Sequence, residues 1–372
     1  MTIQVGVVGY GNAAKSFHIP FVQAVPAYTI TAVLQRAEAP VEKSPGSHCT
    51  VDLPGVRHHR TAEAFFADKD IDLVVVATRN DTHIEFAEKA LLAGKHAIVD
   101  KPFAQSSADA DRVIKLADEK GLILTVFQNR RWDSDFRTLQ SLLAKNALGK
   151  IMEAELHYDF EAAPWLKHMT AKEYTPGAGH AFGLGTHNID QAYVLFGRPK
   201  SVTAFFRSQR GIDSEVEDSF TIILQYADEK LVTVKTCVVS CMEKQLKQLI
   251  RGTEGSWIKW QQRSTCTQEE QIAQGVKPLD PAFGKEPPGL EGTLTTYKEF
   301  DASFQTYQPE TNKYSGQAPS LPGHWVGLYE SLADAILGKG ELQVKASEAR
   351  DVLRIIELAR ESHEKGVTVA WK

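Results

Sequence analysis

The sequence predicts an α/β protein of two domains, a doubly wound parallel sheet followed by an α+β domain with a mostly antiparallel, open-faced sheet. Over the first 125 residues, short apolar runs alternate with amphipathic stretches, as in strand–helix–strand units. From about residue 150, strand-like runs follow one another directly. The length of 372 residues also exceeds one ordinary core. We therefore expect domains at 1–125 and 126–372, with a final helix near 346–364 that could pack back on the first domain.

Five short apolar runs predict the strands of the first domain. The run Ile3–Val8 is continuous, which is typical of a strand buried on both faces of a parallel sheet. The other runs are Ile30–Leu34, Leu73–Ala77, His96–Val99 and Leu122–Phe127. Because helical stretches separate several of these strands, a parallel sheet is favoured.

Two amphipathic stretches predict helices between these strands. They are Thr82–Ala93 and Ser106–Glu119. Either Ser106 or Ser107 can cap the second helix, and Gly94 and Gly121 stand where the two helices would end.

The second half of the chain predicts a sheet with one packed face. Alternating residues favour antiparallel strands there. The predicted strands are Ile151–Tyr158, Ser201–Arg207, Ser219–Tyr226, Leu231–Val239 and Gln245–Arg251. Helices are predicted over Gly185–Phe196, Gly327–Leu337 and Ala346–Glu364. Residues 262–320 are rich in Gly, Pro, Gln and Thr with little periodicity, so we expect loops.

Charge and composition exclude several classes of function. The net charge is −5, so the chain has no global basic field for nucleic acid or an anionic membrane. No window supplies the ~18–20 apolar residues of a membrane helix, and the N-terminus lacks the pattern of an export signal. The four cysteines are therefore expected to be reduced thiols in the cytoplasm. Histidines and cysteines lack metal-ligand spacings, so no metal is predicted.

A glycine-rich turn follows the first strand and predicts a phosphate-binding cradle. Its residues are Gly9, Tyr10, Gly11, Asn12 and Ala13, with Ala14 at the third glycine position of a dinucleotide-binding sequence. Gly9 allows a tight turn, and Gly11 lets the backbone approach a pyrophosphate. The following helix presents free N–H groups to the phosphates. The first domain is therefore predicted to be a Rossmann domain.

The end of the second strand indicates which dinucleotide binds. NAD-specific proteins usually place Asp or Glu there for the ribose 2′-hydroxyl. This chain has Leu34, Gln35 and Arg36 instead. A guanidinium pairs with a 2′-phosphate that a carboxylate would repel, so NADP is predicted over NAD. The alternative for Arg36 is a solvated surface arginine.

An ordered set of short motifs resembles the Gfo/Idh/MocA family of glucose–fructose oxidoreductases and inositol dehydrogenases. The resemblance is strongest toward NADP-dependent scyllo-inositol dehydrogenases and runs from residue 1 to the C-terminal helix. After the glycine turn, the set comprises Thr78–His83, Asp100–Pro102, Gln128–Trp132, Gly185–Asp190 and Gly252–Ser256. Each motif alone is weak evidence, but their order along the chain is specific.

The resemblance implies catalytic roles for Lys101, His187 and Asp190. Lys101 would hydrogen-bond the reacting oxygen and stabilise its developing charge. His187 matches the family histidine that exchanges the alcohol proton, a task suited to a pKa near neutrality. Asp190, one helical turn further on, would orient His187, bind a substrate hydroxyl or make a structural hydrogen bond. Asp100 stands where the family has glutamate and keeps its charge.

The resemblance also implies further contacts with the cofactor. Those expected at the nicotinamide edge or elsewhere on the cofactor are Thr78, Arg79, Asn80, His83, Asp100, Lys101, Asn129, Arg131, Trp132 and Trp165. Arg131 and Trp132 could instead form a surface pair, and Trp165 could be an ordinary buried tryptophan. Tyr158, His180 and Tyr329 are candidates for the pocket.

One departure from the family concerns the substrate. Many inositol dehydrogenases carry aspartate four residues before the catalytic histidine, where this chain has Gly183. The reaction expected is hydride transfer between NADP and a CH–OH carbon of a polyol, inositol or sugar. The alternative is a non-enzymatic NADP-binding sensor or transcriptional co-repressor of the same fold, although such proteins can lose Lys101 and His187. A homodimer through the second sheet is also expected.

Overall fold

The computed structural model describes all residues except 1, 42–43, 160, 162–165, 167–169 and 262–265. The chain forms two compact units. The first comprises Met1–Asn129, Lys277–Asp280 and Trp325–Leu353. The second comprises Arg130–Val276, Pro281–His324 and Arg354–Lys372. In the described residues, no helix is both long and apolar enough to cross a membrane.

The first unit is built on a six-stranded sheet in the order β3-β2-β1-β4-β5-β6, and every strand pair is parallel. This is the strand order of a dinucleotide-binding Rossmann domain, so the predicted fold class is confirmed. The strands are β1 (Ile3–Val8), β2 (Tyr28–Leu34), β3 (Arg57–His59), β4 (Leu73–Val76), β5 (His96–Val99) and β6 (Leu124–Val126). The strand β3 was not predicted, because its three residues are polar and not buried in the core.

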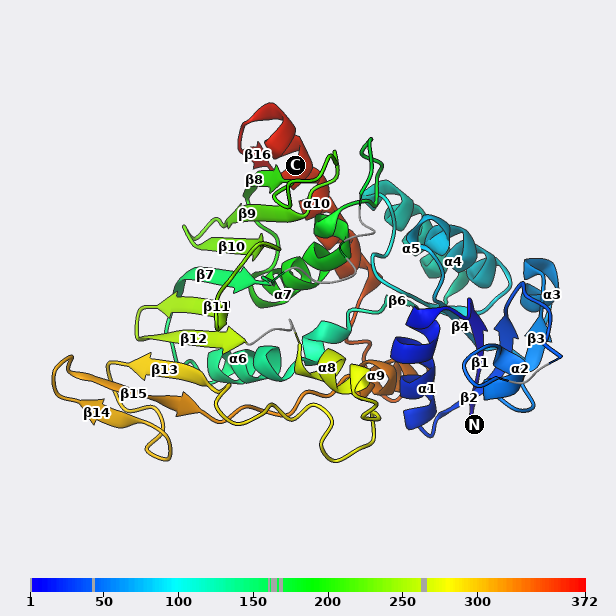
Figure 1. The fold of residues 1–372 in the computed structure, drawn as a ribbon, viewed down its shortest axis with the longest axis horizontal. Helices are drawn as coiled ribbons and strands as arrows, with labels where there is room; N and C mark the ends of the chain where they lie inside the picture. The colour runs from blue at the N-terminus through cyan, green and yellow to red at the C-terminus, as the bar shows by residue number, and fades with distance from the viewer. Residues whose placement is uncertain (1, 42–43, 160, 162–165, 167–169, 262–265) are drawn as a thin grey trace. The chain divides into compact units, whose positions relative to one another are not determined.

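Helices flank this sheet (Figure 1). They are α1 (Ile19–Ala24), α2 (Cys49–Asp52), α3 (Ala62–Phe66), α4 (His83–Leu92), α5 (Ser107–Lys120) and α9 (Val326–Ile336). Of the two predicted caps, Ser106 is the one used: its Oγ accepts a hydrogen bond from the Asp109 N–H at 3.1 Å. Gly121 ends α5 in the left-handed region at φ 65°, as its position predicted.

The second unit is built on a ten-stranded sheet in the order β14-β15-β13-β12-β11-β7-β10-β9-β8-β16. Only the β7–β10 pair is parallel, so the predicted mostly antiparallel sheet is confirmed. The first strands along the chain are β7 (Ile151–His157), β8 (Ser201–Arg207), β9 (Ser219–Gln225), β10 (Leu231–Thr236) and β11 (Gln245–Gly252). They are followed by β12 (Gly255–Gln261), β13 (Gly292–Thr296), β14 (Thr306–Gln308), β15 (Lys313–Ala318) and β16 (Val369–Ala370).

The expectation of loops across 262–320 is wrong for most of that segment. It contains the helix α8 (Thr267–Ala273) and the strands β13, β14 and β15, which extend the sheet beyond β12. These strands consist mainly of Thr, Gly, Gln, Lys and Tyr, so hydrophobic alternation did not reveal them. Their order comes from ladder pairing with neighbouring strands instead.

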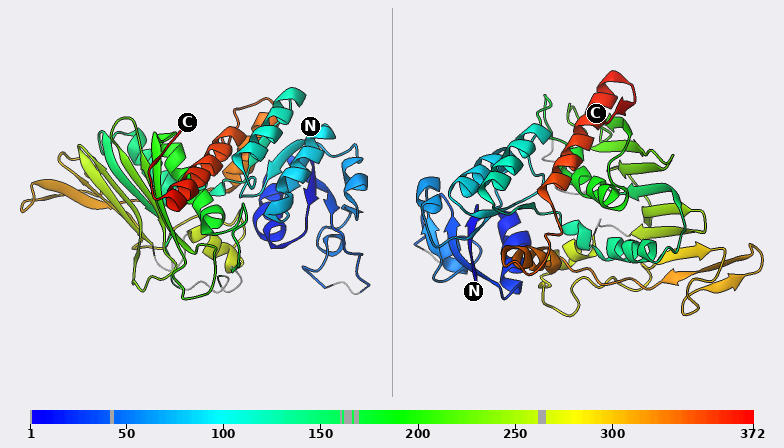
Figure 2. Two further views of the ribbon diagram at one scale, coloured as in Figure 1. Left: turned by 90° about the horizontal axis from the view of Figure 1, so that it is seen from above. Right: turned by 180° about the vertical axis from the view of Figure 1, so that it is seen from behind.

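One face of the second sheet is packed and the other carries no helix among the described residues (Figure 2). The helices α6 (Ser134–Ala144) and α7 (Thr186–Phe196) and the end of α10 (Ala346–Lys365) lie on the packed side. Ile222, Leu224 and Val234 are each 0% exposed. They therefore belong to the core of the unit and do not form an exposed apolar face.

Candidate active site

The glycine turn has the local geometry that its sequence requires. Gly9 has φ +94°, and a Cβ on it would lie 2.5 Å from the carbonyl oxygen of Ala77. Its N–H donates to the Leu34 oxygen at 3.0 Å, which joins the end of β1 to the end of β2. A Cβ on Gly11 would meet no atom within 4 Å. The chain therefore needs glycine at residue 9 for its own packing, whereas a side chain at residue 11 would project into open space.

The other residues of the turn are anchored around this open backbone. Tyr10 donates from its hydroxyl to Asp52 Oδ2 at 2.7 Å, and Asn12 Oδ1 accepts from Ser16 Oγ at 3.2 Å. Ala13 is half-buried and Ala14 is fully buried, which explains a small residue at the third glycine position. The hydrogen bonds from the Gly46 N–H and from Tyr10 lower the pKa of Asp52. The carboxylate is thus held ionised beside the turn.

Arg36 lies on the exposed loop that follows β2. A second guanidinium, that of Arg60, lies beside this loop and was not predicted, because it comes from a different segment. Arg60 Nε donates to the Arg36 carbonyl oxygen at 3.2 Å, and its NH1 lies 2.7 Å from Glu38 Oε1. Two guanidinium groups are thus associated with this loop, and Arg60 is the one paired with Glu38.

Asp100 and Lys101 follow directly after β5, at the carboxyl end of the sheet. Asp100 Oδ1 accepts from the Lys101 N–H at 2.7 Å and lies 3.7 Å from Nε2 of the fully buried His18. Burial alone would raise the pKa of Asp100, but His18, Lys101 and His83 outweigh it, so the pKa is lowered. An ionised carboxylate therefore lies beside Lys101.

His18 is a second residue that was not predicted to lie near the site. Its Nδ1 lies 2.7 Å from the Tyr329 hydroxyl, and its ring packs on Phe127 at 4.3 Å between centroids. Tyr28 donates from its hydroxyl to the Tyr329 carbonyl oxygen at 2.8 Å. Tyr329, a candidate for the pocket, is thus part of a buried polar chain that ends at Asp100. Only the position of His18 shortly after the glycine turn could have suggested this.

His83 joins the ends of two neighbouring strands. Its Nδ1 lies 2.8 Å from the Pro102 carbonyl oxygen, and its Nε2 lies 3.1 Å from the Thr78 carbonyl oxygen. Around it, Thr78 and Asn80 are half-buried, while the Arg79 side chain is 86% exposed and paired with Asp81 at 2.9 Å. His83 therefore positions the segments that carry the predicted cofactor contacts.

In the second unit, Asp190 on α7 is held by Arg131. Arg131 Nε donates to Asp190 Oδ2 at 2.8 Å and its NH2 donates to Oδ1 at 2.6 Å, a bidentate pair between buried side chains. The alternative that Arg131 and Trp132 form a surface pair is wrong for Arg131, which is 9% exposed. Of the three expected roles of Asp190, this geometry supplies the structural one.

His187 lies on α7 beside a tyrosine that two cations cover. The ring centroids of His187 and Tyr158 are 6.5 Å apart. Lys247 Nζ lies 3.5 Å from the Tyr158 centroid, and the Arg130 guanidinium carbon lies 5.3 Å from it. Burial raises the pKa of Tyr158 well above its ordinary value, with Arg130 opposing this shift. Tyr158 is thus a neutral phenol next to the predicted catalytic histidine.

The remaining predicted residues are spread over both units. Asn129 is buried and begins a 3-10 turn over Asn129–Trp132. Trp132 is half-buried, and its carbonyl oxygen accepts from the His324 N–H at 2.8 Å. Trp165 lies outside the described residues. Gly183 lies in the short π-helix Ala181–Gly185 that leads into α7.

Two family models match the chain. The model described as an oxidoreductase family with an NAD-binding Rossmann fold matches residues 3–128. The model described as the GFO/IDH/MocA C-terminal domain matches residues 136–258. The chain belongs to the Gfo/Idh/MocA family of oxidoreductases. The resemblance inferred from the ordered motifs is thereby confirmed.

Several relatives of this Gfo/Idh/MocA protein match it over nearly their whole length. An oxidoreductase of Schizosaccharomyces pombe is 36% identical over 99% of this chain and 99% of its own. The scyllo-inositol 2-dehydrogenase (NADP(+)) IolW of Bacillus subtilis is 31% identical, covering 99% of this chain and 96% of its own. A solved oxidoreductase structure from Bacillus cereus has a TM-score of 0.85 at 25% identity, covering 100% of this chain and 99% of that one.

Proposed function

We propose that this Gfo/Idh/MocA oxidoreductase uses NADP(H) and interconverts a hydroxyl and a carbonyl group on a polyol, inositol or sugar. The observation that carries the proposal is Lys101, placed beside the ionised Asp100 directly after β5 in the unit that holds the glycine turn. In doubly wound sheets, ligands bind at the carboxyl ends of the strands. The 31% identity to an NADP-dependent scyllo-inositol dehydrogenase supports the same class of substrate.

The residues of the first unit fit a dinucleotide. The backbone at Gly11 is open to a ligand, since a Cβ there would meet no atom within 4 Å. Residues 9–13 would hold the pyrophosphate. The 2′-phosphate would be held by Arg36, with Arg60 adding positive charge. The nicotinamide, when bound, supplies the acceptor or donor of hydride.

The protein groups would manage charge and protons at the reacting oxygen. Lys101 would donate a hydrogen bond to that oxygen and stabilise negative charge on it. His187 would take up or return the hydroxyl proton. Asp190, held by Arg131, would keep α7 in place and in this way help to orient His187.

A sensor without catalytic activity is the second candidate function. It is disfavoured by the presence of both Lys101 and His187.

The decisive experiment titrates the purified chain with NADPH and NADH and then assays a panel of cyclic polyols and sugars. Tight NADPH binding with turnover supports the proposal. Tight binding without turnover on any member of the panel favours the sensor, and preference for NADH contradicts the role of Arg36.

We also propose a homodimer through the open face of the second sheet. Phe205 on β8 and Leu231 on β10 are 52% and 42% exposed there, with β9 between the two strands. Exposed large apolar side chains on a sheet face can mark an interface. Light scattering at micromolar concentration should give twice the monomer mass. A monomeric mass would contradict the proposal.

A further inference from the structure

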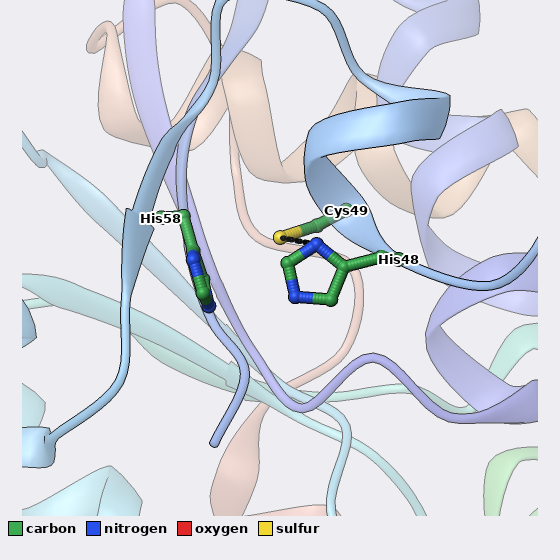
Figure 3. Close-up of side chains that lie close together, drawn as sticks. All are labelled: His48, Cys49 and His58. Atoms are coloured by element: carbon green, nitrogen blue, oxygen red, sulfur yellow. Dashed lines mark hydrogen bonds between the residues drawn. The ribbon is translucent and has the colours of Figure 1, made fainter. Parts of the chain in front are cut away.

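Three potential metal ligands meet beside the loop that carries Arg36. They are His48 and Cys49 at the start of α2 and His58 on β3 (Figure 3). One ligand atom from each lies within 4.8 Å of the other two, and His48 Nδ1 is 3.9 Å from Cys49 Sγ. A tetrahedral zinc ion requires donor atoms about 3.3–3.6 Å apart. Small side-chain movements would therefore close the set around one ion.

The hydrogen bonds of the two histidines leave the correct nitrogen available. His58 Nε2 lies 2.8 Å from the Gln35 carbonyl oxygen, and His48 Nε2 lies 3.3 Å from the Ala37 carbonyl oxygen. Because a carbonyl only accepts, each Nε2 carries the proton and each Nδ1 keeps its lone pair. A ligating histidine in a metal site typically donates its other N–H to a carbonyl in this way.

We propose that Cys49 Sγ, His48 Nδ1 and His58 Nδ1 form a zinc site, with water as the fourth ligand. One thiolate and two imidazoles suit a borderline-soft ion and do not suit magnesium or calcium, which take oxygen ligands. His48 and Cys49 are buried, whereas His58 is half-buried, so an ion could enter the site from solvent beside His58. The site lies at α2 and β3, whereas Lys101 follows β5, so the two are separated by several strands of the sheet.

Binding the ion replaces an existing interaction. His48 Nδ1 now lies 2.9 Å from Thr50 Oγ1 and accepts from the Thr50 N–H at 3.3 Å. A metal–nitrogen bond at Nδ1 would take the place of these contacts, both of which Thr50 can make to water. Spacing along the chain did not reveal the site, because His58 reaches it only through the pairing of β3 with β2.

The site would influence the proposed 2′-phosphate loop. The carbonyl groups that the two histidines contact belong to Gln35 and Ala37, on either side of Arg36. The Cys49 N–H also donates to Gln35 Oε1 at 3.0 Å. A bound ion would fix this loop and lower the cost of ordering Arg36 around a phosphate. This consequence rests on the proposed function, whereas the metal site does not.

The test titrates the full chain with Co²⁺, which gives a thiolate charge-transfer band when a cysteine binds it. We expect one Co²⁺ per chain with that band, and its loss when Zn²⁺ is added. Cys49→Ser should abolish the band, while the matched control Cys241→Ser, at an exposed free cysteine, should keep it. His58→Gln retains Cys49 and should weaken Co²⁺ binding at least about tenfold. Circular dichroism verifies that each variant is folded.

The absence of the band from the wild-type chain would overturn the metal site, as would a band that survives Cys49→Ser. An unchanged affinity in a folded His58→Gln variant would also contradict it. NADPH titrations with and without Zn²⁺ test the coupling separately. Tighter NADPH binding with Zn²⁺ supports it, and equal binding overturns the coupling while leaving the cobalt result to decide the site.

Discussion

The two units hold their functional groups by different means. In the first unit, most of the key features are backbone ones: the missing Cβ of Gly11, the strand end before Lys101 and the carbonyl groups around His83. The contact of His18 with Asp100 is the exception. In the second unit, buried charges are paired across the sequence, as Arg131 and Asp190 are over 59 positions. A feature of the local backbone can be predicted from a short stretch of sequence. A pair of side chains from distant segments can be recognised only in the folded chain.

The largest expected effect is on stability and comes from breaking the buried Arg131–Asp190 pair. Arg131→Ala leaves Asp190 buried without its bidentate partner, and we expect a loss of about 3–5 kcal/mol in the free energy of unfolding. Urea denaturation measures it. The matched control is Arg251→Ala, which removes an exposed pair to Glu153 at 2.6 Å and should cost at most about 1 kcal/mol. Equal losses in the two variants would contradict the contrast between buried and exposed pairs.

The next largest effect is on turnover and concerns Lys101, which follows the end of β5 in the first unit. Lys101→Ala should reduce kcat on a productive substrate by about 100- to 1,000-fold, because a donor to the developing charge is lost. NADPH affinity, followed by fluorescence, should stay within about threefold. Lys89→Ala, at a half-exposed lysine of α4 paired with Glu85, should behave as the wild type. Near-normal turnover in Lys101→Ala would remove this residue from the mechanism.

A third effect depends on pH and tests the second unit. Burial lowers the pKa of His180 from 6.5 to about 4. Between pH 6.5 and pH 4, His180 is protonated in the unfolded chain but stays neutral in the folded chain. The free energy of unfolding therefore falls by up to about 3 kcal/mol as the pH is lowered through this range. Above pH 6.5 the residue has no such effect. His180→Gln should flatten this part of the stability curve, and an unchanged curve would show that His180 is already protonated or exposed.

The smallest expected effect is a change in the ratio of the affinities for NADPH and NADH. Arg36→Ala should weaken NADPH binding by about 10- to 100-fold, the value of a charged hydrogen bond, with little change for NADH. Isothermal titration gives both affinities. Arg57→Ala, which loses a pair to Asp68 in the same unit, should leave their ratio unchanged. A similar loss for NADPH and NADH would exclude contact with the 2′-phosphate.

The sequence predicted the parts of the fold that depend on local patterns. The central strands of the first sheet and the cap at Ser106 are set by neighbouring residues, and the structure confirms them. The ladder of β13 to β15 was missed, because its side chains carry no apolar period. A segment without hydrophobic periodicity can therefore still form strands when its backbone pairs with a neighbouring strand.

The candidate site divides in the same way. The glycine turn and Lys101 could be placed from consecutive residues. His18 beneath Asp100, Arg60 beside Arg36 and the Arg131 pair could not, since each joins segments that meet only in the folded chain. A single sequence shows which residues have suitable chemistry, but it does not show which of them are already bound to one another.

The order of strands in the second sheet has a consequence for synthesis on the ribosome. β7 pairs with β10 and β11, so its partners are made only after residues up to 252 have been translated. By contrast, β1 has both of its partners by residue 76. Such distant pairing is slow to form and leaves strand edges open meanwhile. The edge at β8 is paired last of all, by Val369 and Ala370, so in a nascent chain this edge stays open to other strands until those two residues have been made.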